Sequence, residues 1–246
     1  MLHHTLNWTG DKTFVIADIT FTLDITPGNN RRASEKNNFT LVKTRSYLKD
    51  YLDLDGKEFE NILELGVFQG GSIVFFDKLF KPKKLVGIEL ASTPVEALDY
   101  YIRTAAPHIK IFYNSSQDDE KLLTTIVSEE FGGQLDLVVD DASHLYAQTR
   151  KSMEVLFPLL RPGGTYIIED WAWSHRRNAQ TNEHPWRKKP AMTNLIFEVI
   201  AELGGSNEIE SVYVNNNHVK VRKSLKSTSG SLLDSLALRG RKMSQI

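Results

Sequence analysis

Short, largely apolar runs alternate with helix-like segments over residues 59–171. Runs of this kind, without a regular polar alternation, are typical of strands that are covered on both faces. Five strand–helix units in succession predict an α/β fold with a doubly wound, mostly parallel sheet. The strands are expected at residues 62–65, 84–88, 109–112, 135–139 and 165–168, and the helices at 71–80, 93–105, 117–131 and 145–160.

The segments on either side of this core have different patterns. An alternating, β-branched run over residues 13–25 predicts one or two strands, and the polar stretch PGNNRRASEKNN after it predicts a loop or lid. Helical spacing of apolar residues predicts helices over 39–54 and 192–203, and a hairpin is expected at 210–214 and 218–221. The predicted division is an N-terminal β extension (1–38), a main domain (39–223) and a C-terminal tail (224–246).

Composition narrows the class of protein. The 246 residues have a formal charge of −1 and no cysteine. The absence of cysteine excludes disulfides, thiolate metal sites and a cysteine nucleophile. The nearly neutral charge weighs against a nucleic-acid partner. No apolar run approaches the roughly 20 residues that cross a bilayer, and the first residues do not resemble a signal peptide. A cytoplasmic protein without a membrane partner is therefore expected.

A glycine-rich turn follows the first predicted strand of the sheet. It runs from Glu64 through Gly66 and Gly70 to Ser72, at the start of a helix. Glycines there let a ligand approach the backbone, and helix amides can bind its polar groups. Phe68 breaks the GxGxxG spacing, so a dinucleotide site is disfavoured. The acidic Glu64 suits a cationic group such as an amino-acid ammonium.

Polar residues also end the second and third predicted strands. Glu89 ends the second strand, where an acid can accept both ribose hydroxyls of an adenosine. The stretch from Asn114 to Asp118, which includes Gln117, follows the third strand. Two interpretations remain open for it, because its side chains suit either the adenine edge or a helix cap.

Acidic residues gather after the fourth and fifth predicted strands. Asp140 and Asp141 precede His144 by a few residues, and Glu169 and Asp170 end the next strand. Because adjacent parallel strands end side by side, Asp141, Glu169 and Asp170 are expected to converge. Such oxygen ligands favour Mg²⁺ or Mn²⁺ over zinc, with His144 as a general base. The alternative is that these acids cap helices and pair with nearby cations, among them Arg176, Arg177, Lys188 and Lys189.

These motifs, ELGVFQGGS, the strand-ending Glu89, DDASH and RPGGTYIIED, resemble class I S-adenosylmethionine (SAM)-dependent methyltransferases. More narrowly, they are similar to the metal-dependent O-methyltransferases of macrolide sugars and the related cephalosporin-hydroxylase and rhamnosyl O-methyltransferase group. The resemblance covers about residues 60–171 and implies a Rossmann-like sheet of seven strands that ends in an antiparallel hairpin. It also implies a homo-oligomer. The cofactor-binding residues that it implies are Glu64, Gly66, Gly70, Ser72, Glu89, Gln117 and Asp140.

The resemblance implies that Asp141, Glu169 and Asp170 hold Mg²⁺ and that His144 removes the proton from a hydroxyl acceptor. The expected function is thus O-methylation of a small molecule, such as a sugar or glycosylated natural product. Three alternatives stay open: a catechol-like diol O-methyltransferase, an NAD-linked oxidoreductase, and a non-catalytic cofactor-binding subunit. The aromatic stretch 172–190 is either part of the acceptor site or a surface loop.

Overall fold

The computed structural model describes residues 6–54, 57–227 and 232–233. The chain forms two compact units, residues 1–115 and 116–246. Seven strands make one sheet in the order β10-β11-β9-β8-β5-β6-β7, and a second sheet has the order β1-β2-β3-β4. The predicted α/β fold with a C-terminal hairpin and an N-terminal β extension is confirmed. Most of the predicted tail, 224–246, lies outside the described residues.

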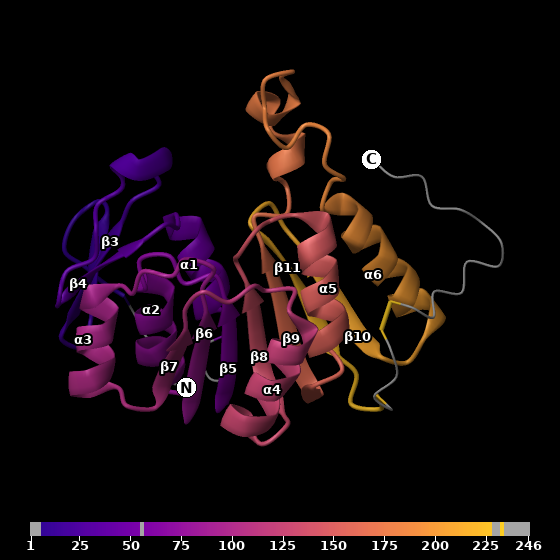
Figure 1. The fold of residues 1–246 in the computed structure, drawn as a ribbon, viewed down its shortest axis with the longest axis horizontal. Helices are drawn as coiled ribbons and strands as arrows, with labels where there is room; N and C mark the ends of the chain where they lie inside the picture. The colour runs from indigo at the N-terminus through magenta and orange to yellow at the C-terminus, as the bar shows by residue number, and fades with distance from the viewer. Residues whose placement is uncertain (1–5, 55–56, 228–231, 234–246) are drawn as a thin grey trace. The chain divides into compact units, whose positions relative to one another are not determined.

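In the first unit, three parallel strands follow the predicted pattern. They are β5 (Asn61–Leu65), β6 (Lys84–Ile88) and β7 (Ile109–Phe112). Helices α2 (Gly71–Phe80) and α3 (Glu96–Ala105) connect them, as Figure 1 shows. The β5–α2 connection holds the glycine-rich turn, which therefore lies where the carboxyl end of a parallel strand meets a helix.

The N-terminal extension is a four-stranded sheet, and it reaches further along the chain than predicted. Strands β1 (Asn7–Trp8), β2 (Thr13–Ile16) and β3 (Ile19–Leu23) are antiparallel, and β4 (Asn38–Leu41) pairs in parallel with β3. A short 3₁₀ turn, η1 (Gly28–Asn30), lies in the predicted loop. The prediction of a helix from residue 39 was wrong. Helix α1 (Arg45–Leu52) begins only where the Thr44 side chain accepts a hydrogen bond from the Tyr47 amide.

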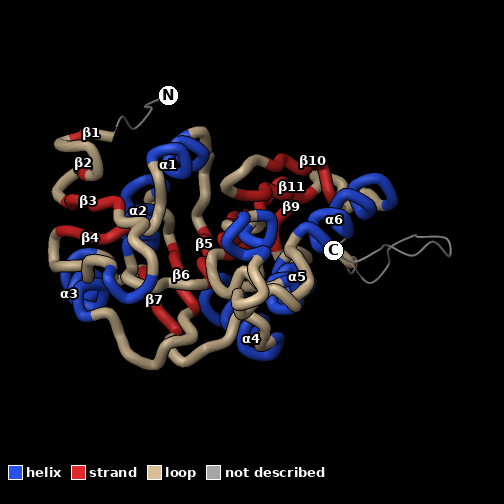
Figure 2. Tube along the Cα trace, turned by 90° about the horizontal axis from the view of Figure 1, so that it is seen from above, coloured by secondary structure: helices blue, strands red, loops and turns tan. Residues whose placement is uncertain are grey.

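Helix α2 lies between this small sheet and strands β5 to β7 (Figure 2). The Phe75 ring packs edge-on against Phe14, Phe21 and Tyr51, at centroid distances of 6.2, 6.0 and 6.4 Å. All four rings are fully buried. The extension is therefore part of the hydrophobic core of its unit, because its aromatic residues cover the outer face of α2.

We expect Gly71→Ala to destabilise the fold, because a Cβ at Gly71 would lie 2.1 Å from the Thr40 carbonyl oxygen. Backbone must then shift, at a cost of about 1–3 kcal/mol in the free energy of unfolding. Gly204→Ala in α6 is the matched control, since a Cβ there meets nothing within 4 Å and alanine favours a helix. Urea denaturation of both variants checks this, and equal midpoints would contradict it.

In the second unit, β8 (Leu135–Asp140) pairs in parallel with β9 (Leu160–Glu169). The predicted hairpin is β10 (Ile209–Val214) and β11 (His218–Lys223), and β11 runs antiparallel to β9. Helices α4 (Glu120–Phe131), α5 (Tyr146–Leu156) and α6 (Thr193–Gly205) pack beside these strands (Figure 2). Two short 3₁₀ turns, η2 (Trp173–His175) and η3 (Arg177–Gln180), follow β9.

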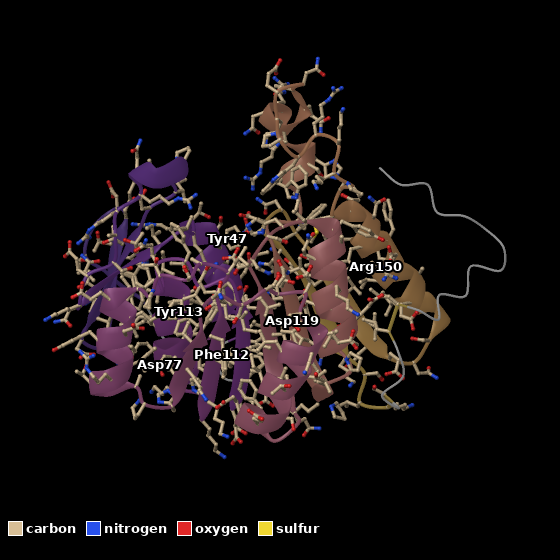
Figure 3. The ribbon with its side chains drawn as sticks, viewed as in Figure 1. Tyr47, Asp77, Phe112, Tyr113, Asp119 and Arg150 are labelled. Carbon is tan, nitrogen blue, oxygen red and sulfur yellow. The ribbon has the colours of Figure 1, made fainter. Side chains whose placement is uncertain are left out.

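A charged network joins two of these helices. Arg150 of α5, labelled in Figure 3, donates to Glu198 of α6 at 2.7 Å and also pairs with Glu154. Burial raises the pKa of the Tyr146 hydroxyl, which donates to Glu198, to about 12. The tyrosine therefore stays protonated and keeps this bond at neutral pH. Within the part of the chain that the structure describes, no helix is long and apolar enough to cross a membrane.

Candidate active site

Two carboxylates and an imidazole lie together at the carboxyl ends of β8 and β9. One ligand atom of each of Asp141, His144 and Asp170 lies within 4.8 Å of the other two, and His144 Nε2 is 3.9 Å from Asp141 Oδ1. The parallel register aligns Asp140 with Ile168, so the residues that follow the two strands are neighbours. We call Asp141, His144 and Asp170 the acid–histidine cluster. Three potential ligand atoms this close together make the cluster a candidate site for a divalent ion.

Two residues of this cluster have a strained backbone. His144 has a φ of 55° and Asp170 a φ of 49°, in the left-handed region that non-glycine residues seldom occupy. Tertiary hydrogen bonds hold both residues. The Asp170 amide donates to the Asn217 carbonyl at 3.0 Å, and Trp173 Nε1 donates to the His144 carbonyl at 2.6 Å. The fold thus maintains a costly conformation that brings the side chains together.

Glu169, the third predicted metal ligand, lies apart from the acid–histidine cluster. It ends β9 opposite His218 of β11, and its side chain is buried. Part of the alternative interpretation is also present, because Arg176 Nη2 lies 3.3 Å from Asp170 Oδ1. That ion pair is more than a third exposed at both partners, so it contributes at most about 1 kcal/mol to stability.

Asp140 lies in a buried polar network behind the cluster. Its carboxylate accepts hydrogen bonds from Ser152 at 2.8 Å, from Tyr166 at 3.0 Å and from Gln117 Nε2 at 3.1 Å. Burial raises the pKa of the Asp140 carboxyl, and the bonds from Ser152 and Tyr166 oppose that shift. Gln117 Oε1 accepts from the Ser143 amide at 2.9 Å, so the network also holds the turn between Asp141 and His144.

In the other unit, residues 66–70, which we call the glycine loop, leave β5 in a sharp turn. Gly66 and Gly70 have φ values of 89° and 75°, and Phe68 has a φ of 48°. Glu64 is buried in β5, and Ser72 is buried in the first turn of α2. The two glycines therefore lie where the backbone requires positive φ. Because they have no side chain, a ligand can also approach the backbone closely there.

Glu89, predicted to bind the ribose, is held by backbone amides. Its Oε2 accepts from Val67 and Phe68 of the glycine loop at 3.0 and 2.8 Å, and its Oε1 accepts from Ala91 at 2.8 Å. A carboxylate has about four acceptor positions, so one remains for a ligand hydroxyl. Glu89 and the glycine loop thus form one hydrogen-bonded unit.

The aromatic stretch after β9 folds on itself above the strand ends (Figure 1). Trp173 is buried, stacks on His184 at 6.1 Å and meets Trp186 edge-on at 4.9 Å. Trp171 Nε1 donates to the Asn215 carbonyl at 2.7 Å. These contacts tie the stretch to the β10–β11 turn and to His144.

Sequence reasoning missed several contributors to these sites. Ser152 and Tyr166 lie in the middle of a helix and a strand, where no motif marks them as partners of Asp140. The D-x-x-H spacing of Asp141 and His144 is a signal that the histidine can share an ion with the acid. The sequence interpretation used His144 only as a base.

Comparisons with known proteins agree with this fold. Residues 63–171 match the family model described as "Methyltransferase domain". Mycinamicin VI 2''-O-methyltransferase of Micromonospora griseorubida is 30% identical over 155 residues, which are 60% of this chain and 36% of the relative. L-olivosyl-oleandolide 3-O-methyltransferase of Streptomyces antibioticus is 29% identical over 116 residues, 44% of this chain and 27% of that relative. The chain thus matches about a third of the length of these curated relatives.

Solved structures show the same fold. The MycE methyltransferase of the mycinamycin pathway, in complex with Mg, SAH and mycinamycin VI, superposes with a TM-score of 0.57 at 24% identity, over 76% of this chain and 50% of that one. A putative caffeoyl-CoA O-methyltransferase from Staphylococcus aureus superposes with a TM-score of 0.54 at 16% identity. The match covers 76% of this chain and 86% of that one. The match of residues 63–171 to the methyltransferase-domain model agrees with the resemblance, and the solved structures, all under 25% identical, show that the chain shares their fold.

Proposed function

We propose that this protein is a SAM-dependent, divalent-metal-dependent O-methyltransferase that acts on a hydroxyl of a small molecule. The observation that carries the proposal is the acid–histidine cluster at the ends of β8 and β9, inside a methyltransferase domain. The two carboxylates are oxygen donors of the kind that suits Mg²⁺ or Mn²⁺, and strained backbone at His144 and Asp170 holds the imidazole beside them.

The predicted cofactor-binding residues are part of this proposal. Glu64, Gly66, Gly70, Ser72 and Glu89 supply an acid for the ammonium, an open backbone and an acceptor for a ribose hydroxyl. The sequence interpretation adds Gln117 and Asp140, and their mutual hydrogen bond supports a joint role. MycE and an O-methyltransferase from Bacillus cereus were both solved with SAH, which agrees with this choice.

The metal and the base have different proposed roles toward the acceptor hydroxyl. A bound divalent ion lowers the pKa of a hydroxyl and fixes its position. Asp141 and Asp170 are assigned to the ion, and Glu169, the third predicted ligand, precedes Asp170 at the end of β9. His144, whose Nε2 faces Asp141, would accept the proton of the acceptor hydroxyl, and bound SAM would supply the activated methyl group. The strained turn at His144 holds the imidazole beside the acids.

We propose that the acceptor is a sugar of a glycosylated natural product. The curated relatives are named for methylation of mycinamicin VI at 2'' and of the olivosyl group of an oleandolide. The aromatic stretch supports this, because Trp171 and Trp186 offer rings of the kind on which a sugar face packs. The homo-oligomer that the resemblance implies and the cytoplasmic location that the composition predicts are part of the same proposal.

Calorimetric titration of S-adenosylhomocysteine (SAH) into the purified chain, with Mg²⁺ and again with EDTA, tests the cofactor class. We expect micromolar binding in both buffers, because the glycine loop and Glu89 need no ion. A folded sample that binds no SAH would contradict the proposal and favour the oxidoreductase or subunit alternatives. A screen of glycoside and catechol acceptors then separates the two kinds of O-methyltransferase.

A further inference from the structure

Residues 31–34, in the polar stretch before β4, contact the glycine loop directly. Ser34 Oγ donates to the Gln69 carbonyl at 2.7 Å, and the Ser34 amide donates to Gln69 Oε1 at 3.1 Å. The Arg31 guanidinium lies over the Phe68 ring, 5.3 Å from its centroid. We call residues 31–34 the clamp segment, because it holds two consecutive residues of the loop.

The clamp segment is itself anchored to β4 and to the stretch that follows β3. Ser34 Oγ accepts from the Thr40 amide of β4 at 3.0 Å, and Arg31 Nε donates to the Thr26 carbonyl at 2.8 Å. The Thr40 carbonyl is also the group against which Gly71 packs. Since β4 pairs with β3, whose Phe21 packs against the buried Phe75, the Thr40 contact joins the clamp segment to the hydrophobic core.

One residue held by the clamp segment, Phe68, has an unfavourable backbone conformation. Phe68 combines a left-handed φ of 48° with a side chain that is 48% exposed, although phenylalanine favours neither. On one side its amide donates to Glu89 at 2.8 Å, and on the other its ring meets Arg31. The conformation therefore persists because contacts from two elements determine it.

We propose that Ser34 and Arg31 are positioning residues for the cofactor. They keep Phe68 and Gln69 in the conformation in which the loop amides engage Glu89. The N-terminal extension, whose polar stretch was predicted to be a loop or lid, then supports the conformation of the glycine loop. The inference rests on the proposed function, because it takes the ligand of the loop to be SAM.

The test compares Ser34→Ala and Arg31→Ala with the matched control Arg32→Ala. Arg32 belongs to the same segment but pairs with Glu35, 3.0 Å away, and donates to Thr22. By calorimetry we expect Ser34→Ala to weaken SAH binding roughly 3- to 10-fold, the range that one or two lost hydrogen bonds produce. Arg31→Ala should weaken it about 2- to 5-fold. The control should change the Kd less than twofold.

Two further measurements separate positioning from general stability. Hydrogen exchange without SAH should speed up at residues 66–71 in Ser34→Ala, while exchange in α3 stays as in the wild type. Ser34→Thr keeps the hydroxyl and should restore both the SAH affinity and the protection. An unchanged Kd in Ser34→Ala, with a wild type that binds SAH, would overturn this inference alone. A wild type that binds no SAH would overturn the proposed function and the cofactor link with it.

Discussion

Replacing Asp170 by asparagine is expected to weaken Mn²⁺ binding roughly 10- to 100-fold, because it removes one of the two carboxylates of the acid–histidine cluster. The side chain keeps its size, and asparagine tolerates the left-handed backbone that residue 170 adopts, with a φ of 49°. The loss should therefore come from the missing charge and not from a refolded turn. Titration of Mn²⁺, followed by electron paramagnetic resonance or calorimetry, measures it without an acceptor.

Two control variants make that result specific. Asp119→Asn removes a carboxylate outside the cluster (Asp119 is labelled in Figure 3), and asparagine caps α4 as well as aspartate does. It should leave the Mn²⁺ affinity unchanged. Arg176→Ala removes the cation 3.3 Å from Asp170, and the affinity should stay equal or rise. If Asp170→Asn also left the affinity unchanged, the acids would have a structural role.

Consecutive acids at two strand ends show where sequence reasoning reached its limit. In both pairs, Asp140-Asp141 and Glu169-Asp170, the first acid ends its strand and is buried, and the second joins the cluster. Successive side chains of a strand point to opposite faces, so neighbours in sequence separate in space. The sequence predicted that the strand ends would meet. It placed both acids of the second pair with Asp141, whereas the cluster contains Asp170 without Glu169.

The other features differ in whether a local sequence pattern determines them. The parallel strands were predictable, because strands buried on both faces consist of short apolar runs. The strand at 38–41 was not, since its apolar residues also fit helical spacing and only pairing with β3 decides between the two. The contact of Ser34 with Gln69 spans 35 residues, and no local pattern carries such a contact.

Replacing His144 by asparagine or alanine should lower the rate of methyl transfer from SAM to a glycoside acceptor by about 10²- to 10⁴-fold, the usual effect of losing a general base. Asparagine is the better probe, because it tolerates the φ of 55° at this position. If His144 acts as the base, both variants keep the SAH affinity within a few-fold and keep the Mn²⁺ affinity.

The Mn²⁺ titration decides between the two roles that the cluster allows for His144. Its Nε2 lies 3.9 Å from Asp141 Oδ1, which is too far for a hydrogen bond and suits an ion or an acceptor hydroxyl between them. A ligand role predicts that His144→Asn loses Mn²⁺ affinity as Asp170→Asn does. A base role predicts retained Mn²⁺ affinity together with the lost rate of methyl transfer. Unchanged turnover would remove His144 from the mechanism.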